Sequence, residues 1–171
     1  MQLKNRIKNV KYLFISLYGV LGKNKVLQNE KNKIFLSNIQ DGMGVTLGLM
    51  SGLKIVVVGN NFYPSSKRRA KELKTTEQIS TKKSFEQYIN FITMNSINED
   101  EIAWIASDLD VLSFFKKAKL RITIPEAPDE IKKIANFVTK KSGGNGALRE
   151  IIETIIKHQG KWKSVIEVYY D

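Results

Sequence analysis

The chain contains no cysteine, which excludes disulfides, thiolate metal sites and cysteine nucleophiles. This absence fits a reducing compartment, so we expect a cytoplasmic protein. There is also only one histidine, His158, which lies just before Gly160 at the end of the last predicted helix. A histidine in that position is typically a partner of the helix dipole rather than a catalyst.

Long apolar runs are missing as well. The first apolar stretch, KYLFISLYGVLG at residues 11–22, is too short to span a membrane. Basic residues precede it, as in a secretory signal, but no small-x-small cleavage site follows. We therefore interpret residues 11–16 as a buried first strand and expect no membrane partner.

Positive charge is the main compositional bias. The 171 residues include 28 Lys and Arg against 17 Asp and Glu, a net charge of +11. A surplus of this size favours association with nucleic acid or anionic surfaces. However, the basic residues are spread along the chain at positions typical of exposed helix faces, and no nucleic-acid-binding motif accompanies them. We therefore expect no nucleic-acid partner and keep a basic polyanion-binding module as the lowest-ranked alternative.

Length and hydrophobic patterning predict a single domain over residues 1–171. Buried strands are predicted at residues 11–16, 53–59, 101–107 and 120–124, and a weaker one at 75–79. Helices are predicted at residues 41–52, 64–74, 82–94, 110–118, 128–137 and 147–159. Asp41 is expected to cap the first helix, and residues 23–36 predict a β-hairpin with a polar tip.

This alternation of strands and helices predicts a three-layer, Rossmann-like α/β fold. Its sheet should be mainly parallel, with helices on both faces and right-handed crossovers. In such folds the functional site lies at the carboxyl ends of the strands. The residues that follow the strands there are Ser16, Tyr18, Gly59, Asn60, Asn61, Ser107 and Asp108.

Several stretches, together with the order of the elements, resemble a known family. They are YGVL at 18–21, QDGMG at 40–44, RRAKEL at 68–73, IAWIASDL at 102–109 and TKKSGGNGALREIIETIIKHQGKW at 139–162. In these stretches the chain resembles the haloacid dehalogenase (HAD) superfamily, and specifically its small phosphatases that hydrolyse 3-deoxy-D-manno-octulosonate (KDO) 8-phosphate. The resemblance implies a HAD-like fold without a cap domain, and active relatives depend on Mg²⁺.

The resemblance also indicates where the family's catalytic residues would stand, and the chain departs from the first two motifs. The first motif, Asp-x-Asp after the first strand, supplies the nucleophile that forms an aspartyl-phosphate and then the acid/base. Here these positions hold Ser16 and Tyr18. The second motif, a Ser or Thr that bonds the phosphoryl group, followed by Gly-Arg, is replaced by Gly59, Asn60 and Asn61.

The third and fourth motifs are altered too. The family's charge-neutralising Lys aligns with Ser84, although Lys82 and Lys83 lie close enough for a shift in register to supply it. The fourth motif, Gly-Asp-Asp-x-x-Asp, holds Mg²⁺ in the family. It becomes ASDLDV at residues 106–111, in which Asp108 is retained in place.

These replacements predict the loss of the metal and of the reaction. In the family, Mg²⁺ is held by the first-motif Asp, the backbone carbonyl of the second Asp position and a fourth-motif Asp. Mg²⁺ needs hard oxygen ligands, usually including carboxylates, and Asp108 is the one retained candidate beside the neutral oxygens of Ser16 and Ser107. Because phosphoryl transfer depends on the nucleophile and on charge stabilisation, we expect no bound cofactor and no catalysis by the family mechanism.

Two interpretations of Ser16 and Tyr18 remain open. A serine nucleophile needs a base, and a Ser–Tyr–Lys arrangement with Lys82 or Lys83 can be drawn. Alternatively, the two side chains simply fill the old catalytic cavity. Asp41 is similarly open between a helix cap and a ligand contact, and Asp110 is interpreted as an N-terminal helix charge.

Our first functional hypothesis is a catalytically silent family member, a scaffold, regulator or ligand-binding protein in KDO or sialic-acid metabolism. By analogy with the family, it would form a homotetramer through the hairpin at 23–36 and could accompany a sugar-activation enzyme. The alternative is an active hydrolase that acts on a phosphorylated sugar acid with altered chemistry. Its polar pocket, suited to an anion, would comprise Ser16, Tyr18, Gly59, Asn60, Asn61, Lys82, Lys83, Ser107 and Asp108.

Overall fold

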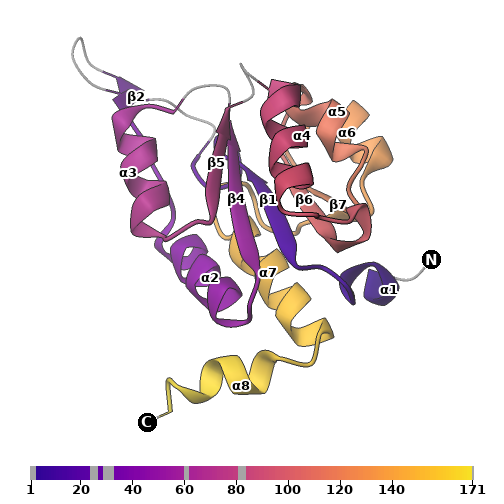
Figure 1. Ribbon diagram of the computed structural model, residues 1–171. Coiled ribbons are helices and arrows are strands. Elements are labelled where there is room, and N and C mark those ends of the chain that lie inside the picture. Colours follow the sequence, from indigo (N-terminus) through magenta and orange to yellow (C-terminus); the bar gives the residue numbers. More distant parts are fainter. Residues whose placement is uncertain (1–2, 24–26, 29–32, 60–61, 81–83, 171) are drawn as a thin grey trace.

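The computed structural model describes residues 3–23, 27–28, 33–59, 62–80 and 84–170 (Figure 1). Its centre is a six-stranded sheet with the order β5-β4-β1-β6-β7-β8, in which every pair of neighbours is parallel. The strands are β1 (Tyr12–Ser16), β4 (Lys54–Gly59), β5 (Glu77–Ser80), β6 (Ile102–Ala106), β7 (Leu120–Thr123) and β8 (Phe137–Val138). The predicted α/β fold with a parallel sheet is confirmed.

The central strands form where the sequence is apolar on both faces. Every residue of β1 and β6 is buried, and so is all of β4 after Lys54. Because side chains alternate along a strand, Phe14 of β1 and its partner Trp104 of β6 face one helical layer. Leu13 and its partner Ile55 of β4 face the other layer. Strands buried in this way require helices on both faces of the sheet.

Helices do cover both faces (Figure 1). On the face of Ile55 lie α2 (Ile39–Met50) and α7 (Ala147–His158). On the face of Trp104 lie α4 (Ser84–Met94) and α5 (Leu112–Phe115). The helix α3 (Pro64–Glu72) connects β4 to β5 and begins at the proline, as predicted.

An aromatic cluster fills the layer between the sheet and α4 and α5. The fully buried Trp104 ring stacks on Phe14, with ring centroids 4.9 Å apart, and on Phe114, with centroids 5.8 Å apart. Tyr88 of α4 contacts Phe14 edge-on at 5.5 Å. This packing buries Trp104 completely at the centre of the sheet.

A hairpin follows the first strand, as expected. Its strands β2 (Leu27–Gln28) and β3 (Lys33–Ile34) pair antiparallel. An isolated antiparallel bridge between Gly22 and Ser37 closes its base. The polar tip of the predicted hairpin lies outside the described residues.

The start of α2 differs from the prediction. Asp41 was expected as the cap, but the N-cap is Asn38, whose side-chain oxygen accepts a hydrogen bond from the Gln40 N–H at 2.7 Å. The helix therefore begins at Ile39, two residues before Asp41. Asp41 lies in the first turn of α2 and is fully buried. Its carboxylate accepts hydrogen bonds from the start of another helix.

The predicted helix at 128–137 is also shorter than expected. The helix α6 (Asp129–Ile134) ends early, and Phe137–Val138 form the edge strand β8 beside β7. The reason is Asn136, whose N–H donates to the Arg121 carbonyl at 2.6 Å while its side-chain oxygen accepts from the Arg121 N–H at 2.9 Å. These two bonds extend the ladder of β7 and draw the chain out of the helix.

Two short helices at the ends of the chain were not predicted. They are α1 (Leu3–Ile7) and α8 (Trp162–Glu167), and the second is anchored by the buried Val165. Short 3₁₀ turns, η2 (Glu99–Glu101) and η3 (Leu109–Val111), precede β6 and α5. Within the described ranges, none of the helices combines the length and the apolar character that crossing a bilayer requires.

Candidate functional site

A cavity of about 340 Å³ opens at the carboxyl edge of the sheet, between the ends of β1, β4 and β6. It is lined by Ser16, Leu17, Tyr18, Val58, Gly59, Ser107, Asp108 and Asp110. Five residues that the sequence singled out therefore meet in one place, because the carboxyl ends of neighbouring parallel strands share an edge. Asn60, Asn61, Lys82 and Lys83 lie outside the described residues, and Ser84 is described only as the first residue of α4.

Asp110 belongs to the cavity although the sequence suggested only a helix-end charge. It does lie in the 3₁₀ turn η3, but its side chain also lines the cavity beside Asp108. The residue as a whole is exposed, yet its carboxyl group is partly covered by the cavity wall. This burial, together with the negative charge of Asp108, raises the pKa of the Asp110 carboxyl above its ordinary value.

Ser16 ends β1 with its side chain turned into the cavity. The residue is only 4% exposed, and its hydroxyl makes no hydrogen bond with any part of the chain that the structure describes. A buried hydroxyl without a partner typically costs about 1–3 kcal/mol. The Ser16 hydroxyl is therefore available to a group that enters the cavity.

Tyr18 follows the end of β1, and its ring faces two other aromatic rings. The ring centroid lies 5.8 Å from that of Phe35 and 6.5 Å from that of Tyr63. Burial raises the pKa of the Tyr18 hydroxyl, and the nearby Ser66 hydroxyl offsets this only in part. Ser66 donates instead to the Tyr63 carbonyl at 3.0 Å, and its geometry toward Tyr18 falls short of a hydrogen bond. A phenol of this kind stays protonated at neutral pH and is a poor base for Ser16.

The loops after β1 and β6 are joined by a direct hydrogen bond. The Ser107 hydroxyl donates to the Tyr18 backbone carbonyl at 2.7 Å. The next residue, Asp108, accepts a hydrogen bond from the Leu109 N–H at 2.7 Å and so caps the turn η3. In the resemblance described above, the Tyr18 position supplies its carbonyl to a magnesium ion. Here that oxygen accepts a hydrogen bond from the Ser107 side chain of the same protein.

Gly59 is tightly packed at the end of β4. A Cβ atom at this position would lie 2.9 Å from the Cβ of Leu17, closer than real Cβ atoms come to a neighbour. The two strands are held together here by the Leu17 N–H, which donates to the Val58 carbonyl at 2.7 Å. The Ser or Thr that the family carries at position 59 would therefore require the Leu17 side chain to move.

The donor set does not fit a magnesium site of the family type. No cluster of three or more acidic, histidine or cysteine side chains that could hold an ion occurs among the described residues. Of the three protein ligands that the resemblance implies, Ser16 offers a neutral hydroxyl and the Tyr18 carbonyl already accepts a hydrogen bond. Only a carboxylate of Asp108 or Asp110 remains, which is fewer ligands than Mg²⁺ usually receives from a dedicated site.

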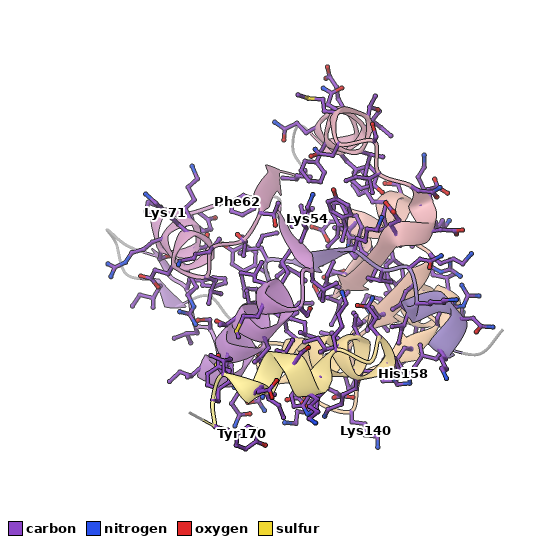
Figure 2. All side chains as sticks on the ribbon, turned by 60° about the horizontal axis from the view of Figure 1, so that its bottom comes forward. Lys54, Phe62, Lys71, Lys140, His158 and Tyr170 are labelled. Atoms are coloured by element: carbon purple, nitrogen blue, oxygen red, sulfur yellow. The ribbon has the colours of Figure 1, made fainter. Side chains whose placement is uncertain are left out.

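His158 lies far from this cavity. It ends α7 (Figure 2). It lines a groove of about 850 Å³ at the opposite edge of the sheet, together with Val10 and Lys11, which precede β1. Its Nδ1 lies 2.8 Å from the Thr154 carbonyl one turn back. The only histidine of the chain is therefore not a base for Ser16.

The glycine-rich stretch before α7 has a structural role. A Cβ atom on Gly143 would lie 1.6 Å from the Gly19 carbonyl oxygen, so the stretch packs directly on the loop after β1. Gly146 starts α7 with a φ of 102°, a conformation that favours glycine. Its N–H donates to Asp41 at 2.9 Å, and that of Arg149 donates to the other oxygen of the same carboxylate, also at 2.9 Å. The sequence left Asp41 open between a cap and a ligand contact, and the structure makes it a cap, but of α7.

The parallel sheet, the hairpin after its first strand and an uncapped cavity at its carboxyl edge together define a HAD-like α/β protein. No model of a known protein family matches the chain. Among curated proteins, it is similar to the KDO 8-phosphate phosphatase KdsC of Escherichia coli K12, with 22% identity over 158 residues that cover 91% of this chain and 84% of that protein. The KdsC protein of Haemophilus influenzae is 22% identical over 161 residues, covering 93% and 89% of the two chains.

Solved structures agree with this assignment. A HAD superfamily (subfamily III A) hydrolase from Legionella pneumophila superposes with a TM-score of 0.92 and 25% identity, over 98% of this chain and 93% of that one. A KDO 8-phosphate phosphatase from Moraxella catarrhalis, in complex with magnesium, phosphate and KDO, gives a TM-score of 0.88 and 26% identity over 97% of each chain. These likenesses support the HAD superfamily, and within it the KDO 8-phosphate phosphatase-like subfamily, as the resemblance indicated.

Proposed function

We propose that this protein is a non-catalytic homologue of the KDO 8-phosphate phosphatases. It retains the fold and a small pocket and acts as a ligand-binding, regulatory or scaffold protein in sugar-acid metabolism. One observation carries the proposal: the Ser107 hydroxyl bonds the Tyr18 carbonyl at 2.7 Å, where the resemblance places a magnesium ligand. The Ser16 hydroxyl beside it stands where the family has its nucleophilic carboxylate.

The chemistry of the pocket supports this proposal. A serine becomes a nucleophile when a base accepts its proton, and no group of the described residues hydrogen-bonds to the Ser16 hydroxyl. The phosphoryl group also needs cations to stabilise its developing charge, whereas the charged side chains known to line this cavity are the carboxylates Asp108 and Asp110. The nucleophile and the metal ligands act together in catalysis, so the proposed loss of both would abolish the reaction.

A phosphate-release assay tests the proposal. The purified protein would be incubated with KDO 8-phosphate and with a general aryl phosphate in the presence of Mg²⁺ or Co²⁺, beside an active relative. We expect no release above the background of a protein-free control. Release that Asp108→Asn or Ser16→Ala abolishes would overturn the proposal in favour of a hydrolase with altered chemistry. The matched Asp129→Asn variant, which changes an exposed carboxylate of α6, controls for contaminating phosphatase.

We also propose that the protein assembles through its hairpin, as a homotetramer by analogy with the family. Two apolar side chains next to the hairpin support this: Ile34 of β3 is 50% exposed and Ile39, two residues after Ser37, is 86% exposed. Contiguous exposed apolar patches mark surfaces that a second chain covers, and we propose that these two isoleucines belong to one. A sugar-activation enzyme would be the heterologous partner, and co-purification with the tagged full chain would test it.

The positive charge offers weaker support for a polyanion-binding function. Lys71 on α3 and Lys140 after β8 lie on well-separated parts of the molecule (Figure 2). Several cations are paired within the chain, including Lys11 with Glu101 and Arg68 with Glu72. We therefore rank this function lowest, and salt-dependent binding to nucleic acid would be needed to raise it.

A further inference from the structure

The described lining of the cavity at the carboxyl edge carries the wrong charge for a phosphate group. Among its described lining residues, the charged side chains are Asp108 and Asp110, and the other six are neutral. An anion placed there would face two carboxylates without a compensating cation from these residues. Two negative charges at close range repel each other, so the carboxylates would repel an anionic ligand. The anionic ligand that the sequence suggested therefore does not match the described lining.

Two residues that line this cavity carry a buried hydroxyl group without a partner in the described part of the chain. The Ser16 residue is 4% exposed, and both its hydroxyl and that of Tyr18 make no hydrogen bond with the described part of the chain. The Ser107 hydroxyl, in contrast, already donates a hydrogen bond to the Tyr18 carbonyl. Buried hydroxyls are normally satisfied by protein, water or ligand. The described lining thus combines the unsatisfied Ser16 hydroxyl with two exposed carboxylates.

We propose that this cavity binds a small hydroxylated amine of the amino-sugar class. The ammonium group would lie against Asp108 and Asp110, and ring hydroxyls would hydrogen-bond to Ser16. This assignment rests on the proposed function, because it requires a pocket that holds neither a metal ion nor a phosphoryl group. The cavity volume of about 340 Å³ is at the small end of the range for ligand pockets, which suits a single sugar ring.

The electrostatics of the pair of carboxylates favour such a ligand. Both carboxylates line the cavity, and none of its described lining residues supplies a cation to compensate their negative charge. An ammonium group would compensate it through charge-assisted hydrogen bonds, which are about twice as strong as neutral ones. A neutral sugar of the same shape would gain only the contacts with the hydroxyls.

Calorimetric titration of the full chain at slightly acidic pH, without added metal, tests the inference. The probes are glucosamine, glucose, glucose 6-phosphate and inorganic phosphate. We expect glucosamine to bind measurably more tightly than glucose, and the two phosphates not to bind. Asp110→Asn should weaken glucosamine binding about tenfold or more, because a charge-assisted hydrogen bond is lost, while leaving the weak binding of glucose unchanged. Ser16→Ala should weaken both sugars alike.

The control variant is Asp129→Asn, which removes the same charge from an exposed position on α6. The inference fails if neither sugar binds, if either phosphate binds more tightly than glucosamine, or if Asp110→Asn and Asp129→Asn have equal effects. Circular dichroism of each variant distinguishes lost binding from lost folding. These failures are separate from failure of the proposed function, which is detected by phosphate release from KDO 8-phosphate.

Discussion

The Asp41 carboxylate of α2 accepts a hydrogen bond from the backbone N–H of Arg149 at 2.9 Å, and through this contact one helix caps another. The other carboxylate oxygen accepts from Gly146 at the start of α7. Gly44 of α2 makes the approach possible, because a Cβ atom there would lie 2.9 Å from the Cα of Arg149. The polar contact and the close packing thus fix the two helices on one face of the sheet.

Asp41→Ala should lower the free energy of unfolding by about 2–4 kcal/mol, because it removes a helix cap and leaves two buried N–H groups without acceptors. Burial raises the pKa of Asp41 against the opposing effect of the backbone N–H groups, so Asp41→Asn should cost less than alanine. Urea unfolding followed by circular dichroism measures both variants. Asp129→Ala, at an exposed position, is the control and should change stability by less than about 0.5 kcal/mol. A loss below about 1 kcal/mol in Asp41→Ala would contradict the cap.

Glu153 predicts a pH-dependent contribution to stability. Burial acts to raise its pKa, but hydrogen bonds and positive charge from Lys157 and Arg149 outweigh burial and hold the pKa below its usual range. Because the folded-state pKa is lowered, the stabilisation is present above the unfolded-state pKa and is lost as pH falls through the folded-state value. Glu153→Gln should therefore cost about 1 kcal/mol at neutral pH, and the difference should shrink in acid.

The measurement is urea unfolding of wild type and Glu153→Gln at a series of pH values. Glu130→Gln, at an exposed position in the first turn of α6, is the control and should show a difference that does not depend on pH. A gap between wild type and Glu153→Gln that stays constant or widens in acid would exclude the ion pairs as its source.

The fold should not depend on a divalent cation. Since the Ser107 hydroxyl joins the two loops directly, we expect the thermal unfolding midpoint to be the same in EDTA and in excess Mg²⁺. Ser107→Ala should destabilise the protein by about 1 kcal/mol, because the Tyr18 carbonyl loses its donor. Ser113→Ala, at an exposed position of α5, should have no comparable effect. A magnesium-dependent rise of the wild-type midpoint beyond about 2 °C would mean that the metal binds after all.

Restoring the first motif alone should not restore an enzyme. The double variant Ser16→Asp with Tyr18→Asp regains two carboxylates, but Gly59 and Ser107 still differ from the family pattern. Gly59 is held by the tight contact with Leu17, so the missing Ser or Thr has no room without local movement. We expect phosphate release from KDO 8-phosphate far below that of an active relative. Turnover close to the relative's would show that Gly59 and Ser107 do not prevent catalysis.

Ile39 offers a test of self-association. Ile39→Glu should reduce the molar mass measured by light scattering after size-exclusion chromatography, because a charge would be buried without a partner in the interface. Met94→Glu is a closely matched control, since Met94 is 85% exposed against 86% for Ile39 but lies on α4, away from the hairpin. Equal molar masses for both variants and the wild type would show that the surface beside the hairpin is not the interface.

The sequence was sufficient to predict the central strands and several of the residues that gather at the carboxyl edge of the sheet. Apolar runs on both faces specify β1, β4 and β6, and the rule for parallel sheets then brings Ser16, Gly59 and Ser107 to one edge. The edge strand β8 was missed because it has two residues, and its register depends on the Asn136 side chain bonding to Arg121. Hydrophobic periodicity contains no information about such a contact.

Long-range polar contacts likewise could not be predicted from the sequence. Asp41 has the pattern of a local cap, and only the three-dimensional packing of α2 on α7 brings it to Gly146, 105 positions further along the chain. Similarly, Asp110 could be assigned to the start of a helix, but its place in the cavity depends on how the turn η3 is oriented. The Ser107–Tyr18 bond joins residues that are 89 positions apart.

The contact between Gly143 and the Gly19 carbonyl, where a Cβ atom would come within 1.6 Å of the oxygen, has an evolutionary consequence. A side chain at Gly143 would collide with the loop that contains Gly19 unless that loop moved away. Substitutions in the two loops must therefore arise together or in a permissive order. Relatives of this chain that changed their chemistry should therefore differ at the tips of their side chains far more than in the path of these two loops.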